Sequence, residues 1–151
     1  MKLKTLVGSG DKLGLLALPF IIIGVGLNIW KPGWFSVGGP MLWLKILSII
    51  VLIPGIIIWA WSVYLILTKI PEKKLITSGP YALVKHPLYT GVALLVLPWV
   101  GFLCNSWLGL IIGAAFFTGR IIFAPEEEKI LSKEFGAEWD AYKNKVYLPW
   151  L

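Results

Sequence analysis

The sequence predicts an all-α membrane protein, a polytopic bundle of about four transmembrane helices followed by a cytoplasmic amphipathic C-terminal helix. Three observations lead to this prediction: the composition, the grouping of apolar residues into segments, and the placement of basic residues between them. Of the 151 residues, 58% are hydrophobic and 15% are charged, whereas soluble domains are about 45–50% apolar and about 25% charged. A soluble chain of this length could hardly bury so much apolar surface, so we expect one integral membrane domain over residues 1–151.

Four apolar segments are candidate membrane spans, and they cover residues 13–30, 41–67, 88–104 and 107–123. A spanning helix needs roughly 20 residues, so the second segment has room to tilt or to kink. Pro19, Pro54 and Pro98 lie within the first three segments. Proline is tolerated in a membrane helix where neighbouring groups satisfy the freed backbone carbonyl, so these residues do not exclude helices.

The basic residues predict the orientation of the bundle. If the N-terminus is cytoplasmic, all of the 14 Lys and Arg residues except Lys31 and Lys45 fall on the cytoplasmic side, as the positive-inside rule requires. The N- and C-termini are then both cytoplasmic. The net charge of +6 follows from this placement, so we expect no nucleic-acid partner. The short chain, with no recognisable targeting signal, leads us to expect a prokaryotic cell membrane.

The C-terminal charged stretch, residues 126–145, predicts an amphipathic helix. Its apolar residues recur near helical spacing. The preceding Pro125 and the three glutamates that follow it are typical of a helix start, because acidic groups complement the N-terminal dipole. The apolar residues in question are Ile130, Leu131, Phe135, Trp139 and Tyr142.

Two polar groups of residues could carry chemistry, and both lie on the predicted cytoplasmic side. The loop 77–91 brings glycine, proline, two tyrosines, Lys85 and His86 to the mouth of a span; it is either an interfacial turn or a site where a polar ligand meets the bilayer. Residues 126–128 are three glutamates that either cap a helix or place a carboxylate beside the loop. A carboxylate there is costly to desolvate unless it is paired, and Lys85 and His86 are the available partners. With one His and one Cys (Cys104) in the chain, we expect no metal site.

The spacing of these residues resembles a known family of membrane enzymes. The loop reads G-P-Y-x-x-V-K-H-P-x-Y-x-G over residues 79–91, and Glu127-Glu128 follow about 35 residues later, ahead of Phe135-Gly136, Trp139 and Tyr142. This arrangement is similar to the isoprenylcysteine carboxyl methyltransferase and phospholipid methyltransferase group. The resemblance covers residues 76–149, which we take as the methyltransferase-like catalytic core.

The resemblance implies an S-adenosyl-L-methionine pocket on the cytoplasmic side, capped by the C-terminal segment, with a lipophilic acceptor entering from the bilayer. It implies catalytic roles for Lys85 and Glu127. Lys85 stands where the family usually has Arg, which keeps the charge and loses the bidentate fork. The residues implied in cofactor binding are Gly79, Pro80, Tyr81, His86, Tyr89, Gly91, Glu127 and Glu128.

The function expected from the sequence is therefore transfer of a methyl group from S-adenosyl-L-methionine to a lipophilic acceptor at the cytoplasmic membrane face. Two alternatives remain open. Trp139-x-x-Tyr142 is similar to a pattern in NADPH-dependent sterol and steroid reductases of related fold, although Leu88 stands where those enzymes have Asn. The other alternative is a non-catalytic membrane scaffold that keeps the fold for binding.

Overall fold

The structure, a computed structural model, describes residues 8–39, 41–149 and 151, with side chains from residue 18 onward. In this part of the chain every regular element is helical, and the only bridges between extended residues are isolated ones. Lys2 and Lys4, which contribute to the predicted orientation, lie outside the described residues, and Lys12 is described only in its backbone. The helices are α2 (Gly8–Trp30), α3 (Leu42–Lys69), α4 (Pro80–Leu83), α5 (Pro87–Gly91), the π-helix η1 (Val92–Val96), α6 (Leu97–Leu103), α7 (Leu108–Phe135) and α8 (Ala137–Lys145).

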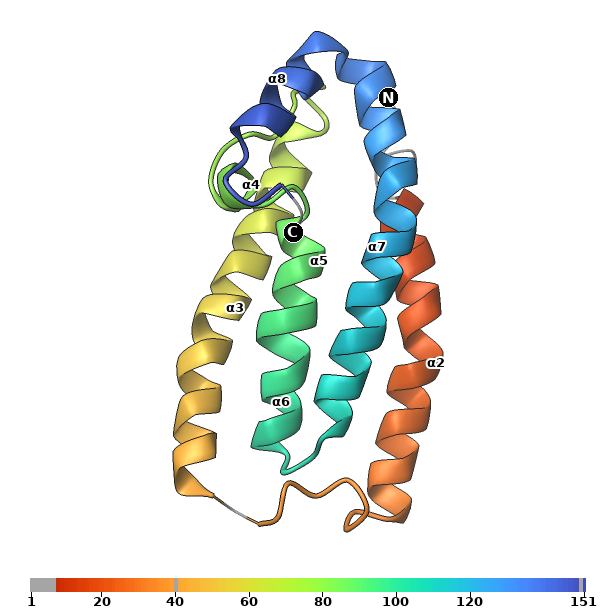
Figure 1. Cartoon of the computed structure of the whole chain (residues 1–151), viewed down its shortest axis with the longest axis vertical. Helices are drawn as coiled ribbons and strands as arrows, with labels where there is room; N and C mark the ends of the chain where they lie inside the picture. The colour runs from red at the N-terminus through yellow and green to blue at the C-terminus, as the bar shows by residue number, and fades with distance from the viewer. Residues whose placement is uncertain (1–7, 40, 150) are drawn as a thin grey trace.

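Four long helical rods lie side by side in the bundle (Figure 1). The consecutive helices α5, η1 and α6 form one rod, which packs against α3 on one side and α7 on the other, and α2 packs on the far side of α7. α3 and α7 are long and apolar enough to cross a membrane, and the shorter apolar stretches are Leu18–Trp30 and Pro87–Leu103. Only 17% of the apolar stretch of α3 is buried inside the molecule. A helix at the core of a soluble protein would be mostly buried, so this exposed apolar surface is compatible with a bilayer.

The rods touch most closely through glycine. A Cβ atom placed on Gly109 of α7 would collide with the carbonyl oxygen of Leu97 and lie 2.6 Å from the Cα atom of Gly101 in α6. Gly113, one turn further along α7, meets the carbonyl oxygen of Ala93 in the same way, at 2.5 Å. Small residues at these positions let the backbones of neighbouring helices approach each other, which is how helices associate in lipid.

Pro98 interrupts the hydrogen-bond ladder of the third rod. A proline has no N–H to donate to the carbonyl four residues earlier, which here is the carbonyl of Leu94. The indole Nε1 of Trp99 donates to that oxygen at 3.2 Å, and the chain passes through the π-helix η1 just before the proline. The side chain of Trp99 thus satisfies a carbonyl that water could not reach inside a bilayer.

The single helix predicted over residues 126–145 is wrong in its bounds. Residues up to Phe135 continue α7, and the chain turns at Gly136, where φ is +50°, before α8 begins at Ala137. Glycine adopts this left-handed conformation at little cost, so it allows the reversal that Figure 1 shows above the bundle. The turn lets Trp139, Tyr142 and Val146 form a buried cluster, against which the partly buried Leu75, Leu131 and Phe135 pack.

Candidate functional site

The end of the bundle near α8 holds a cavity of about 380 Å³. Five parts of the chain line it: the last turns of α3, the loop that follows, the segment from α4 into α5, the end of α7, and α8. α7 projects beyond the other rods and α8 folds back over them (Figure 1), so the cavity lies where the helices separate.

The Lys85-His86 pair lies between two short helices, each of which starts with a proline. Pro80 opens α4 and Pro87 opens α5, a position where the missing N–H of proline costs no helical hydrogen bond. The C-terminal segment holds the connection between them through main-chain hydrogen bonds. The amide of Leu148 donates to Leu83 O at 2.8 Å, and the amide of Lys85 donates to Leu151 O at 3.2 Å.

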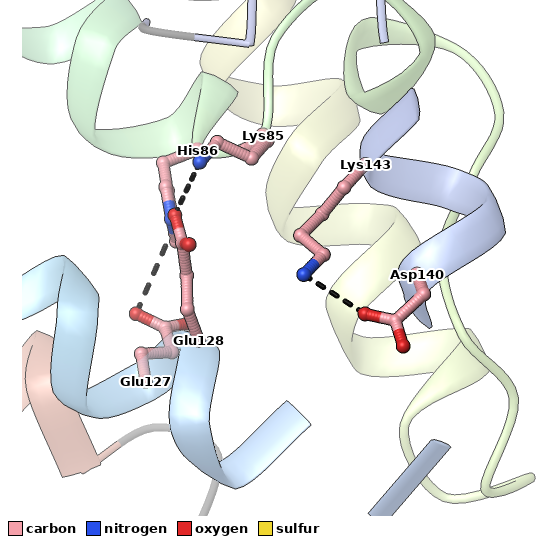
Figure 2. Close-up of polar contacts among 6 residues, drawn as sticks. All are labelled: Lys85, His86, Glu127, Glu128, Asp140 and Lys143. Atoms are coloured by element: carbon pink, nitrogen blue, oxygen red, sulfur yellow. Dashed lines mark hydrogen bonds and ion pairs between the residues drawn. The ribbon is translucent and has the colours of Figure 1, made fainter. Parts of the chain in front are cut away.

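Both glutamates of the sequence motif approach this pair. Lys85 Nζ donates to Glu128 Oε1 at 2.5 Å, and His86 Nε2 lies 3.3 Å from the same oxygen. His86 Nδ1 lies 3.9 Å from Glu127 Oε2, so the imidazole stands between two carboxylates (Figure 2). The side chain of His86 is only 3% exposed, and those of Lys85 and Glu128 are 15% and 26% exposed. This partly buried cluster meets the requirement that a desolvated carboxylate be paired.

The cluster acts on the ionisation of Glu128, which lies on α7 past the apolar stretch and Pro125. The hydrogen bond from His86, together with the hydrogen bond and charge of Lys85, lowers the pKa of the Glu128 carboxyl to about 2, although partial burial acts in the opposite direction. Glu128 is therefore ionised at neutral pH. By contrast, the Lys143–Asp140 pair on α8 in Figure 2 spans 2.9 Å between exposed side chains, and such surface pairs contribute little.

Tyrosines form another part of the wall. Tyr142 on α8 donates its hydroxyl hydrogen to Tyr81 O at 2.8 Å, which links α8 to α4. Burial raises the pKa of Tyr81 and of Tyr142, and the nearby carboxylates Glu127 and Glu128 respectively act in the same direction. Both phenols are protonated at neutral pH. The ring of Tyr89 stacks on His86 with 6.1 Å between centroids.

The structure brings five of the sequence-predicted site residues to the cavity wall: Tyr81, Lys85, His86, Tyr89 and Glu127. The other four do not line it. Gly79 has φ +62° and packs against the indole ring of Trp61, Pro80 is buried at the start of α4, and Gly91 is buried inside α5 near Ile58. Glu128 is directed at Lys85 and His86.

Sequence reasoning did not identify the other wall residues as part of a site. Phe135, Trp139 and Tyr142 belong to the family-like motif, and the sequence places them with Leu131 on the apolar side of a helix, but it assigns them no part in binding. The contributions of α3 and the loop after it carry no chemical motif, apart from two adjacent lysines in a basic stretch. The members from α3 and that loop are Val63, Ile66, Leu67, Ile70, Lys73, Lys74, Leu75 and Ile76.

Two comparisons with known proteins bear on this site. The model of the isoprenylcysteine carboxyl methyltransferase (ICMT) family matches residues 39–133, which include α3, the loop, α4 to α6 and both glutamates. Two rice proteins, from Oryza sativa subsp. indica and subsp. japonica, are each named probable protein-S-isoprenylcysteine O-methyltransferase. Each is 35% identical to this chain over 79 residues, which make up 50% of the chain and 40% of the relative.

The chain therefore spans less than half the length of these curated relatives, while the family model covers well over half of the chain. The matched region contains the nine predicted site residues and the elements that build most of the cavity, while Phe135, Trp139 and Tyr142 lie beyond it. The chain belongs to the isoprenylcysteine carboxyl methyltransferase family.

Proposed function

We propose that this protein is an integral membrane methyltransferase that uses S-adenosyl-L-methionine to methylate a lipophilic acceptor at the cytoplasmic membrane face. The observation that carries the proposal is the cavity, whose wall combines the carboxylate of Glu127, the cation of Lys85, the imidazole of His86 and several aromatic rings with apolar side chains from α3. A water-soluble donor and an apolar acceptor need such a mixed wall at the edge of an apolar bundle.

The residues of the wall fit S-adenosyl-L-methionine. Small-molecule sites occupy about 300–1,000 Å³, and the cavity of about 380 Å³ falls in this range. The carboxylate of Glu127 complements the positive charges of the donor. The rings of Tyr81, Tyr89 and Trp139 offer flat faces that suit a purine or a cation.

When bound, S-adenosyl-L-methionine supplies a methyl group activated by a positively charged sulfur. The residues of this chain position the reactants and exclude water, which is where most of the rate of such a transfer originates. We assign Glu127 to orientation of the donor. Lys85, held by Glu128, contributes positive charge to the wall, and Trp139 and Tyr142 of α8 keep the cavity dry.

Among the remaining residues of the motif, we assign His86, Tyr81 and Tyr89 to direct contact with the donor because they line the cavity. We assign Gly79, Pro80, Gly91 and Glu128 to shaping the wall. Glu128 does so through its contacts with Lys85 and His86, and Pro80 does so by starting the helix that carries Tyr81.

The proposed topology has four spans with both termini in the cytoplasm, in the cell membrane of a prokaryote. The side-by-side packing of α2, α3, the α5–η1–α6 rod and α7 supports this arrangement. The described lysines gather near the cavity, on the loop after α3 and on α8, while Lys31 and Lys45 lie toward the opposite end. Under the positive-inside rule the cavity then faces the cytoplasm.

Calorimetric titration of the detergent-purified protein with S-adenosylhomocysteine tests the proposal. We expect a dissociation constant in the micromolar range, loss of binding in Glu127→Gln, and retention in Glu134→Gln, which changes an exposed carboxylate on the same helix away from the cavity. Absence of binding to a folded sample would overturn the proposal, and NADPH titrated into the same sample would then test the reductase alternative.

A further inference from the structure

The end of the bundle opposite the cavity carries a lysine between two exposed tryptophans. Lys31 Nζ lies 5.6 Å from the centre of the Trp30 ring and 5.9 Å from the centre of the Trp34 ring. We infer that this turn binds the phosphate of an anionic phospholipid at the membrane surface, with Lys31 as the cation and the two indoles on either side. The inference is independent of the proposed function, because it concerns neither the cavity nor a reaction.

A hydrogen-bonded turn brings the two rings to the lysine. α2 ends at Trp30, at the end of the bundle away from α8 (Figure 1). The amide of Trp34 then donates to Lys31 O at 3.1 Å and closes a turn with Pro32 and Gly33 at its centre, residues that favour such turns. The chain that follows is held against the turn between α6 and α7 by main-chain hydrogen bonds. The site is therefore largely pre-formed, which reduces the cost of ordering it around a ligand.

The chain itself offers Lys31 no counter-charge nearby. In the full sequence no aspartate or glutamate occurs from residue 12 to residue 71 or from residue 73 to residue 125. Asp11 lies near the start of α2, about 28 Å from the end of that helix at a rise of about 1.5 Å per residue. Glu72 and the glutamates after Pro125 belong to the cavity end. The counter-ion of Lys31 must therefore come from outside the protein.

The turn also carries hydrogen-bond donors that the fold does not use. Among the residues that the structure describes, none accepts a hydrogen bond from the Lys31 ammonium or from the indole N–H of Trp30 or Trp34. The two tryptophans are 69% and 71% exposed. A phosphate has several acceptor oxygens, and its hydrogen bonds with an ammonium are stronger than those between neutral groups. One phosphate can therefore accept from more than one of these donors.

The surroundings of the turn favour a lipid as the source of that phosphate. Ile22, Val25 and Ile29 are 61%, 53% and 77% exposed, and their spacing places them along one side of α2. Acyl chains can lie along this apolar side while the head group reaches Lys31. Tryptophan is enriched where membrane spans meet the head groups, and a basic residue there attracts anionic lipids. These features together favour an anionic phospholipid over a zwitterionic one.

Fluorine NMR of the detergent-purified protein labelled with 5-fluorotryptophan tests the inference at the turn itself. The resonances of Trp30 and Trp34 are assigned by their loss in Trp30→Phe and Trp34→Phe. The probes are phosphatidylglycerol and phosphatidylcholine with identical palmitoyl and oleoyl chains. We expect both resonances to reach half-saturation at an about fivefold lower fraction of phosphatidylglycerol, because the attraction of one lysine to anionic lipid contributes about 1 kcal/mol.

The same spectrum contains an internal control. Trp43 is 62% exposed at the start of α3, and in the described structure no cation lies over its ring. Its resonance should show no preference between the two lipids. Glycerol phosphate, which has a phosphate and no acyl chains, should shift neither the Trp30 nor the Trp34 resonance at the same concentration, because the apolar side of α2 contributes to lipid binding.

Variants locate the effect. Lys31→Gln should abolish the preference for phosphatidylglycerol at Trp30 and Trp34, and Lys31→Arg should keep it. Lys45→Gln changes another exposed lysine toward the same end, on α3, and should leave the preference unchanged. Circular dichroism spectra of each variant show that it is folded, so that loss of preference is not loss of structure.

Equal half-saturation by the two lipids in the parent protein would overturn the inference, as would a preference that survives in folded Lys31→Gln. Shifts that glycerol phosphate saturates equally well would also overturn it, because the turn would then bind free phosphate esters. If Lys45→Gln removes the preference as completely as Lys31→Gln does, the lipids respond to the overall charge of this end, and the turn is not a site.

Discussion

The two ends of the bundle are built in opposite ways. At the end with α8, the helices separate, and charged and aromatic side chains surround a cavity. At the other end, the loop after α2 closes against the turn between α6 and α7: the amide of Trp107 donates to Phe35 O at 2.8 Å, and Ser36 forms a bridge with Ser106. Glycines bring α6 and α7 into backbone contact near this turn.

This difference separates the part of the molecule that maintains the fold from the part that is available for chemistry. Where the backbones touch, no space remains for a ligand, and the only nearby thiol, the exposed Cys104, lies far along the bundle from the ion-pair cluster. Where long side chains and proline-initiated turns hold the helices apart, a cavity can persist. Substitutions at the closed end should therefore change stability, and those at the open end should also change ligand binding.

The largest expected effect is at the closed end. Gly109→Ala places a methyl group against the carbonyl of Leu97 and the backbone of Gly101, and backbone atoms cannot move aside cheaply. We expect a loss of about 3 kcal/mol in the free energy of unfolding, measured by thermal unfolding in detergent. The matched control is Gly26→Ala in α2, where nothing lies within 4 Å of the added carbon. Equal stability of the two variants would contradict the proposed close contact.

The next effect concerns Glu128 and pH. Because its pKa is lowered from 4.5 to about 2 in the folded protein, its contribution to stability is complete above pH 4.5 and is lost as the pH falls toward 2. Glu128→Gln should cost about 2 kcal/mol at neutral pH. Melting temperatures measured from pH 6 to pH 2.5 should fall less steeply for Glu128→Gln than for the parent protein. Parallel curves would show that the cluster does not hold Glu128 ionised.

A smaller effect is expected for Tyr142→Phe. This change removes the hydrogen bond to Tyr81 O and should lower stability by about 1 kcal/mol, while weakening binding of S-adenosylhomocysteine because α8 is held less firmly over the cavity. Tyr147→Phe changes an 81% exposed tyrosine of the same segment and serves as the control. If both variants bind the ligand as the parent does, the contact is structural only.

The smallest effect is expected for Ser36→Ala at the closed end. The hydroxyl of Ser36 accepts hydrogen bonds from Asn105 Nδ2 at 2.9 Å and from the amide of Gly38 at 3.2 Å, and its loss should cost about 0.5 kcal/mol. Titration with S-adenosylhomocysteine should be unaffected. A change in ligand affinity would show instead that the two ends of the bundle are coupled.

Much of the fold could be predicted from local pattern. Each of the four apolar segments lies mainly in one rod of the bundle, and Pro98 was correctly expected within a helical segment. The break between α7 and α8 at Gly136 could not be predicted, because the helical spacing of Phe135, Trp139 and Tyr142 continues across this residue. The turn depends on how α8 packs onto residues far away in the sequence, such as Leu75.

Composition and spacing along the chain are enough to predict the helical class and the family, and they offer Lys85 and His86 as partners for a carboxylate of residues 126–128. That this contact forms, and which residues meet at the cavity, follows from the tertiary structure. It separated Glu127 on the wall from its neighbour Glu128 in the ion-pair cluster, and it brought Lys73 of a loop without a motif to the same wall. Adjacent residues on a helix point in different directions, and contacts between distant segments depend on packing that no local pattern records.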